Sequence, residues 1–370
     1  MYDLEIIMPV DLSNPTIAKR FEDFAEWGFL NIENTKIKLF LMASNDTKEQ
    51  ELKELEKKFS EKIHISSIIT PYKHVSQRII YYYSDIVSPE TAKWYMRIDE
   101  DSLTDIAGLI KNLENEFDYT RDYYIVGEIN RVIVEIERKI LSFLGYNCFY
   151  DKIQGHDLRD APAHEFEVSI TSQYAMKRIL NNESCQKYFQ IRKEFAEGVG
   201  DHTLCLAALI EKIYPISVRF LTYHPNATQF SIFSGIHNHI HHISFDRNPE
   251  FLRWLKSLKK EKNEELEKEI TSKENLYFLE WYGNSDKSWI SFNSNKRIEK
   301  TMNNSSFLKE IVGVWGINKQ NKLTLFMNEI YENSPLIVME YDSGSFFCTE
   351  KKMRIELKNL AIKNKKKILM

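Results

Sequence analysis

The first 110 residues alternate between two kinds of apolar pattern, and this alternation restricts the possible folds more than any other feature of the chain. Short apolar runs that end in polar residues, typical of buried strands, occur at 4–10, 37–42, 63–69 and 94–98. Stretches with apolar residues three and four positions apart, typical of amphipathic helices, lie between them at 17–27, 48–59 and 76–83. Strands that alternate with helices predict an α/β domain with a mostly parallel sheet flanked by helices. Ligands of such sheets bind beyond the carboxyl ends of the strands.

The pattern changes twice further along the chain. Residues 120–255 are mixed, with a strand predicted at 123–127, a strand running into a helix over 165–180, and a helix over 201–213. Residues 256–274 are almost entirely Lys and Glu, which indicates a solvated helix or linker at a domain boundary. Short strand candidates at 276–279, 289–292, 312–315, 323–326 and 336–339, separated by Asn, Gly, Ser and Asp, then predict a small antiparallel β module. The predicted parts are a domain at 1–255, the charged segment at 256–274, the β module at 275–350 and a basic tail at 351–370.

Composition excludes several classes of protein. Hydrophobic residues make up 43% of the 370 residues, enough for a packed core. Fifty basic against 54 acidic residues give a net charge of -4, which argues against a nucleic-acid-binding protein. The four cysteines form no CxxC pair, so we expect reduced thiols. The acidic start of the chain and the lack of a long apolar run favour a cytoplasmic protein. The basic tail is either solvated or makes peripheral contact with the inner face of a membrane.

Three consecutive acids, Asp99, Glu100 and Asp101, follow the fourth predicted strand. Ionised carboxylates this close repel one another, and a divalent cation relieves that repulsion. On an extended backbone Asp99 and Asp101 point to the same side, so both can serve one metal ion. The alternative is a solvated acidic turn that caps the next helix, with Asp101 or Ser102 as the N-cap.

Two further sites have the chemistry that such a metal centre needs. Asp201 precedes a predicted helix, whose N-terminus stabilises a carboxylate, and the alternative is an ordinary N-cap. Four of the ten histidines lie within residues 237–242, and on a strand His237 and His239 share one face. Neutral imidazoles and carboxylates together suit Mn²⁺ or Zn²⁺. The alternative for the histidines is a polar surface strand.

The acidic run, preceded by Trp94 and Tyr95, resembles the Asp-x-Asp motif of GT-A glycosyltransferases. The closest resemblance is to the fringe and β-1,3-galactosyltransferase-like branch, and it covers roughly residues 3–250. It implies a GT-A fold, and Mn²⁺ (or Mg²⁺) held by Asp99, Asp101 and either His237 or His239. It also implies that Asp201 is the catalytic base. The donor, a nucleotide-diphosphate sugar with UDP favoured, would contact Pro9, Val10, Asp11, Ser44, Asp46, Arg78, Asp99 and Glu100.

The resemblance predicts a hexosyl- or N-acetylhexosaminyltransferase that moves a sugar to a saccharide or glycolipid hydroxyl with inversion. The abundance of Lys, Asn and Ile suggests a bacterial source and polysaccharide or lipooligosaccharide biosynthesis. No phosphate-binding P-loop, dinucleotide-binding GxGxxG turn or GxSxG elbow occurs. Two alternatives stay open. The β module is a non-catalytic carbohydrate-binding or interaction module that uses Trp281, Trp289 and Trp315, or the acidic and histidine clusters form a metal-dependent hydrolase.

Overall fold

The computed structural model divides into two compact units, the first formed by 1–227 and 237–246 and the second by 228–236 and 247–370. It describes residues 1–28, 32, 35–59, 63–127, 142–145, 168–194, 202–218, 220–222, 239–240, 253–254, 257–258, 271, 277–280, 287–292, 297–301, 309–320, 323–327, 337–342, 345–348 and 353–356. Most of the predicted charged segment at 256–274 lies outside these ranges. Among the described helices, none combines the length and the apolar character needed to cross a bilayer.

A seven-stranded sheet with the order β3-β2-β1-β4-β7-β6-β8 forms the centre of the first unit. Four strands are mutually parallel, namely β1 (Tyr2–Val10), β2 (Ile37–Ala43), β3 (His64–Ile69) and β4 (Ala92–Arg97). The other three are β6 (Tyr124–Val126), β7 (Ser169–Ser172) and β8 (Pro215–Ser217). Strand β7 runs antiparallel to both β4 and β6, whereas β8 is parallel to β6. The predicted mostly parallel α/β sheet is therefore confirmed.

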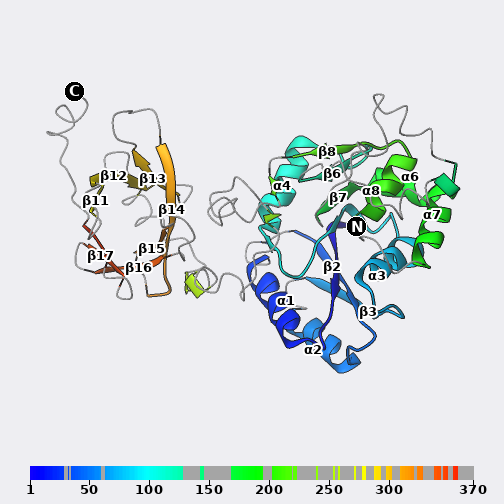
Figure 1. Ribbon diagram of the computed structural model, residues 1–370, viewed down its shortest axis with the longest axis horizontal. Coiled ribbons are helices and arrows are strands. Elements are labelled where there is room, and N and C mark those ends of the chain that lie inside the picture. Colours follow the sequence, from blue (N-terminus) through cyan, green and yellow to red (C-terminus); the bar gives the residue numbers. More distant parts are fainter. Residues whose placement is uncertain are drawn as a thin grey trace. The chain divides into compact units, whose positions relative to one another are not determined.

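Helices cover both faces of this sheet (Figure 1). They are α1 (Pro15–Gly28), α2 (Glu49–Phe59), α3 (Val75–Tyr81), α4 (Ile106–Glu116), α6 (Gln173–Asn181), α7 (Glu183–Lys193) and α8 (His202–Ile210). A single π-helical turn, Tyr82–Ile86, continues α3. The alternation along the strands decides which helices pack where, because successive side chains point to opposite faces. In β1, Ile6 packs in one core with α1, α2 and α4, and Ile7 packs in the other with α3, α6, α7 and α8.

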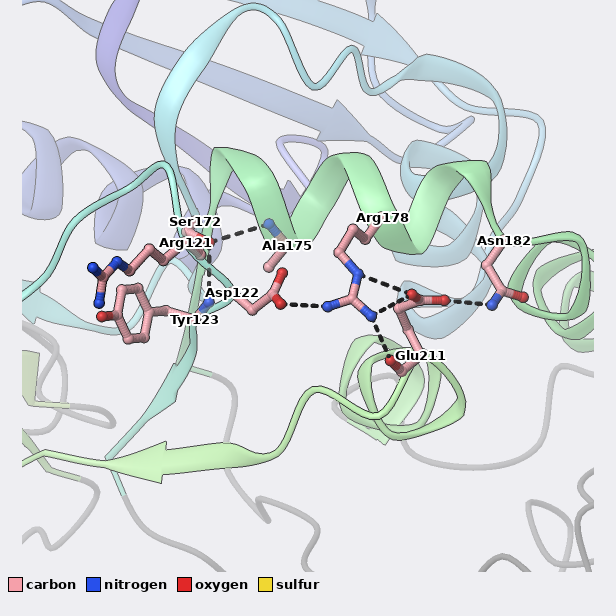
Figure 2. A network of polar contacts seen from close by, with 8 residues as sticks. All are labelled: Arg121, Asp122, Tyr123, Ser172, Ala175, Arg178, Asn182 and Glu211. Atoms are coloured by element: carbon pink, nitrogen blue, oxygen red, sulfur yellow. Dashed lines mark hydrogen bonds and ion pairs between the residues drawn. The ribbon is translucent and has the colours of Figure 1, made fainter.

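A polar network joins α6 to its neighbours (Figure 2). Arg178 on α6 contacts Asp122, which precedes β6, and donates from Nε to Oε1 of Glu211, just after α8, at 2.9 Å. Asn182 donates to the same Glu211 carboxylate. Ser172 caps the start of α6 by accepting a hydrogen bond from the backbone N–H of Ala175 at 3.2 Å. The network fixes the ends of α6 and α8 against the edge of the sheet.

The first unit also contains a small three-stranded sheet that bears on the candidate site. It has the order β5-β10-β9, with β5 at Leu103–Thr104, β9 at Leu221–Thr222 and β10 at His239–Ile240. Strand β10 is antiparallel to β5, and His239 pairs with Thr104. Thr104 and His239, which are 135 positions apart in the sequence, are thus neighbours. Thr104 lies three residues beyond Asp101.

The second unit contains an eight-stranded sheet in which each strand is antiparallel to the next. Its strands are β11 (Tyr277–Glu280), β12 (Lys287–Phe292), β13 (Arg297–Thr301), β14 (Lys309–Ile317), β15 (Leu323–Met327), β16 (Ile337–Asp342), β17 (Ser345–Cys348) and β18 (Met353–Glu356). The sheet curls so that β11 and β18 are in contact. The predicted antiparallel β module is confirmed, although β13, β17 and β18 were not among the predicted strands.

A short segment before this sheet packs on it through a close contact. Leu258 forms an isolated antiparallel bridge with Asn318, and a Cβ atom at Gly316 would lie 2.6 Å from Leu258 Cδ2. Nearby, Trp254 Nε1 donates to Thr324 Oγ1 at 3.1 Å, and its ring stacks on Phe326. Gly316 therefore leaves the space that the leucine side chain occupies.

We expect Gly316→Ala to destabilise the protein by about 1–2 kcal/mol, because the new methyl group overpacks this contact. Leu258→Ala in the same chain should recover part of the loss, since the smaller side chain makes room for the methyl group. Chemical denaturation of the two single variants and the double variant measures this coupling. Strictly additive losses would contradict the contact.

Candidate functional site

The candidate site lies where the strand order of the large sheet reverses. The chain passes from β1 to β2 and β3 on one side, and then returns to place β4 on the other side of β1. Such a reversal leaves a crevice at the carboxyl ends of the two central strands, where ligands of open α/β sheets bind. Val10 pairs with Ala43, and Ile7 pairs with Arg97. The loops that follow β1, β2 and β4 therefore meet at one edge of the sheet.

The acidic run after β4 is crowded and mostly buried. The side chains of Asp99 and Glu100 are each 15% exposed, and Asp101 is 5% exposed. Burial raises the pKa of Glu100 to about 7, and the charges of Asp99 and Asp101 add to that shift. Arg20 from α1 opposes it, with Nη1 at 3.7 Å from Glu100 Oε1. Burial and the two neighbouring carboxylates thus outweigh the effect of Arg20 on the pKa of Glu100.

The backbone of the run differs from the extended form expected from the sequence. Glu100 and Asp101 lie in a turn, so the side chains of Asp99 and Asp101 do not follow strand alternation. The helix-capping alternative is also wrong, because the N-cap of α4 is Asp105, whose Oδ1 accepts a hydrogen bond from Gly108 N at 3.1 Å. Asp101 and Ser102 are therefore not the N-cap of α4, and the metal role of the acids stays a prediction.

The loop after β1 is braced by hydroxyl groups. Asp11 Oδ1 accepts hydrogen bonds from Ser13 Oγ at 2.6 Å and from Ser44 Oγ at 2.9 Å. The hydrogen bond from Ser13 lowers the pKa of Asp11, and Ser44 and the charge of Arg78 act in the same direction. The predicted donor-binding residues Asp11 and Ser44 are therefore in direct contact, across the ends of two adjacent strands.

Arg78 joins the ends of β1 and β2 through hydrogen bonds. Its guanidinium is 3% exposed, and Nη1 donates to the carbonyl oxygens of Val10 at 2.7 Å and Met42 at 3.0 Å. Burial lowers the pKa of Arg78, and the carboxylates of Asp11, Glu100 and Asp99 oppose this shift. Its Nε has no hydrogen-bond partner among the described atoms. Arg78 thus holds the ends of β1 and β2 in place. Its positive charge acts on Asp11 after β1 and on Asp99 and Glu100 after β4.

The small sheet places His239 beside Thr104, three residues beyond the acidic run. It is fully buried, and its Nδ1 lies 2.9 Å from Thr104 Oγ1. A surface position, the alternative considered for the histidine cluster, is therefore wrong for His239. Within the described ranges, no three side chains of His, Cys, Asp or Glu converge as a formed metal site would. The hard carboxylate oxygens of the run still fit a divalent cation by charge and chemistry.

The structure describes only some of the other predicted site residues. Pro9 and Val10 are buried at the end of β1, with Val10 offering only its carbonyl oxygen to Arg78. Asp46 is exposed in the turn after β2. Asp201 and His237 lie outside the described residues, and α8 begins at His202. The roles predicted for Asp201 and His237 therefore stay predictions.

The sequence analysis did not identify two residues that lie near the acids. Arg20 pairs with Glu100, and Thr104 contacts His239. Arg20 is three residues after Ile17 and four before Phe24, so it is a basic residue beside an apolar helical stripe. The sequence placed Arg20 on a helix but did not identify Glu100 as its partner. Nothing in the sequence pairs Thr104 with a histidine 135 positions away.

Arg97 is the last residue of β4 and lies two residues before Asp99. It is 3% exposed, and Nη2 donates to Asp99 Oδ1 at 3.2 Å. The contact fixes one carboxylate of the run from inside the sheet. Arg97 thus offsets part of the negative charge of the run.

We expect Glu100 to make the unfolding free energy fall as the pH rises. Its folded pKa of about 7 lies above the ordinary value of 4.5, so the folded state binds more protons between these values. The stability is present at low pH and lost as the pH rises through 7. In Glu100→Gln, the unfolding free energy at pH 8 should exceed the wild-type value by about 3 kcal/mol, and at pH 4 by almost nothing.

Chemical denaturation at both pH values, in the presence of a chelator, measures this difference. Glu116→Gln, at an exposed position near the end of α4, is the matched control and should change neither value. An equal effect of Glu100→Gln at both pH values would contradict the raised pKa.

No protein-family model matches the chain, and no curated protein matches it. Solved structures with some similarity include the glycosyltransferase GlyE of Streptococcus pneumoniae TIGR4, at 13% identity and a TM-score of 0.38, over 66% of this chain and 56% of GlyE. The chain thus spans little more than half of GlyE.

Two further structures match to a similar degree. The galactosyltransferase LgtC, in complex with donor and acceptor sugar analogues, matches at 10% identity and a TM-score of 0.39, over 64% of this chain and 86% of LgtC. Mouse xyloside xylosyltransferase 1 matches at 11% identity and a TM-score of 0.37, over 65% of this chain and 97% of that protein. Similarity at this level does not establish a family.

Proposed function

We propose that the chain is a GT-A-type glycosyltransferase that transfers a sugar from a nucleotide-diphosphate donor to a saccharide hydroxyl. The observation that carries the proposal is the meeting of the loops after β1, β2 and β4 at the strand-order reversal. Asp11 and Ser44 lie at the ends of β1 and β2, and the acids Asp99, Glu100 and Asp101 follow the adjacent β4. A crevice with hydroxyl and carboxylate groups on one side and an acidic run on the other suits a ribose and a metal-bound diphosphate.

Each group in this arrangement has a role in binding. Asp11 and Ser44 accept and donate hydrogen bonds, as a ribose requires. Asp99 and Asp101 are the residues that would hold the divalent cation. When bound, the cation neutralises charge on the departing diphosphate. Arg97 orients Asp99, and Arg20 limits the repulsion at Glu100.

The finer features of the proposal rest on the sequence motifs. Transfer with inversion requires Asp201 to take the proton of the acceptor hydroxyl as it attacks the anomeric carbon. The kinship to the fringe-like branch, the UDP donor, Mn²⁺, and an acceptor in bacterial polysaccharide or lipooligosaccharide belong to the same proposal. If Asp201 only orients the acceptor, a retaining mechanism stays open.

Release of free nucleoside diphosphate from UDP-, GDP- and dTDP-sugars, and of CMP from CMP-sugars, with and without Mn²⁺, tests the proposal. Metal-dependent release from one donor is the expected result. If a saccharide mixture increases this release, the reaction is transfer and not hydrolysis, because a hydrolase uses only water as the acceptor. If no donor is turned over, and none raises the melting temperature, the proposal is wrong.

A further inference from the structure

The acidic run is faced by arginines from three elements. Arg97, at the end of β4, donates from Nη2 to Asp99 Oδ1 at 3.2 Å. Arg20 on α1 places Nη1 3.7 Å from Glu100 Oε1. The charge of Arg78 on α3 interacts with the same two carboxylates. Positive charges from β4, α1 and α3 thus lie beside a run whose proposed ligand is itself a cation.

Arg97 is held inside the protein. Its side chain is 3% exposed, and the alternation along β4 points it to the face of the sheet that Tyr95 shares, away from Met96. On that face its charge acts on the buried phenols of Tyr83 and Tyr124. Burial raises the pKa of both phenols, so they are neutral and do not offset the charge of the guanidinium. The positive charge of Arg97 therefore acts on the acidic run at short range and with little screening by water.

Arg20 acts on the run from a more accessible position. The side chains of Arg20 and Glu100 are 18% and 15% exposed. Water screens a charge pair more where its members are accessible, so the 3.7 Å contact of Arg20 has a weaker effect than the 3.2 Å contact of Arg97. The two arginines therefore offer a weaker and a stronger case of the same electrostatic effect.

A divalent cation that binds Asp99 and Asp101 experiences these arginines as well as the carboxylates. Like charges repel, so a guanidinium bonded to Asp99 reduces the attraction that this carboxylate exerts on a cation. Within the described ranges, no three His, Cys, Asp or Glu side chains converge to compensate with further ligands. A diphosphate is affected in the opposite sense, because guanidinium groups attract its oxygens. The arginines therefore disfavour a cation that arrives alone and favour the diphosphate.

We propose that Arg97, assisted by Arg20, makes the acidic run bind its cation together with the donor diphosphate and not in advance of it. The inference rests on the proposed function, because it takes Asp99 and Asp101 as the cation ligands. When both ligands bind, the attraction between the arginines and the diphosphate offsets the repulsion between the arginines and the cation. The site then releases the cation with the departing diphosphate, and each turnover takes up a new one.

Titration calorimetry of the full chain, with Mn²⁺ alone and with UDP alone in a chelator, tests the proposal at constant ionic strength. Arg97→Met removes the charge and keeps an unbranched side chain. It should tighten the Kd for Mn²⁺ about tenfold and weaken the Kd for UDP about threefold, since removal of a positive charge acts oppositely on the two ligands. Arg20→Gln should shift both Kd values in the same directions, by about threefold for Mn²⁺. Arg121→Gln, at a side chain that is 75% exposed, is the matched control and should change neither value.

Opposite shifts of the two Kd values are the decisive result, because a substitution that only distorts the site weakens the binding of both ligands. Weaker binding of both ligands in Arg97→Met, or a Kd for Mn²⁺ that neither arginine variant tightens, would overturn the proposal. Failure of the proposed function is recognised separately. The wild-type protein would then bind UDP neither in chelator nor with Mn²⁺, which would remove the inference as well. If Arg97→Met does not fold by circular dichroism, the shifts in Arg20→Gln decide.

Discussion

Asp101→Asn should reduce metal-dependent turnover of the nucleotide-sugar donor by at least about 100-fold, because it removes a proposed metal ligand while keeping the size of the side chain. The same change should not destabilise the protein without metal. Asp101 is one of three crowded carboxylates, and its charge contributes to the raised pKa of Glu100. Removing one charge relieves repulsion, so the melting temperature in chelator should stay equal or rise.

Donor turnover and melting temperature, measured on the same preparation, check both parts. The matched control is Asp118→Asn, an exposed aspartate after α4 whose contacts to Thr120 an asparagine oxygen can also accept. It should change neither quantity. Loss of activity together with a large fall in melting temperature would instead mean that Asp101 supports the fold.

Trp315→Ala should destabilise the β unit by about 3–5 kcal/mol, the usual cost of truncating a buried tryptophan. Trp315 on β14 is fully buried, and its ring packs edge-on against Phe292 with centroids 6.1 Å apart. A residue in that position holds the sheet together and cannot stack on a sugar. The carbohydrate-binding alternative is therefore wrong for Trp315. Trp281 and the side chain of Trp289 lie outside the described structure.

Urea denaturation followed by circular dichroism measures the loss. Tyr174→Ala removes a large ring that is 47% exposed, and as a control it should change stability by less than about 0.5 kcal/mol. If Trp315→Ala folds with wild-type stability and loses only binding to a saccharide, the buried position would be contradicted.

Local patterns predicted most elements of the first unit. The apolar runs became β1 to β4, and the helical stripes became α1, α2 and α3, because burial on a sheet or helix face requires that spacing. Strands β13 and β18 were missed because charged residues alternate along them, so no apolar run marks them. The direction of β7 was also missed, since a strand has the same local pattern whether its neighbours are parallel or antiparallel.

For the candidate site, the sequence by itself determined the chemistry. Three consecutive acids at the end of a buried strand repel one another wherever they lie, so a cation requirement can be predicted from their spacing. Only the tertiary structure decided their neighbours. It placed Arg20 and Arg78 beside the acids, paired His239 with Thr104, and set the turn that replaces the expected extended backbone. These contacts join elements up to 135 residues apart, and their geometry depends on strand order and helix packing, which no local pattern encodes.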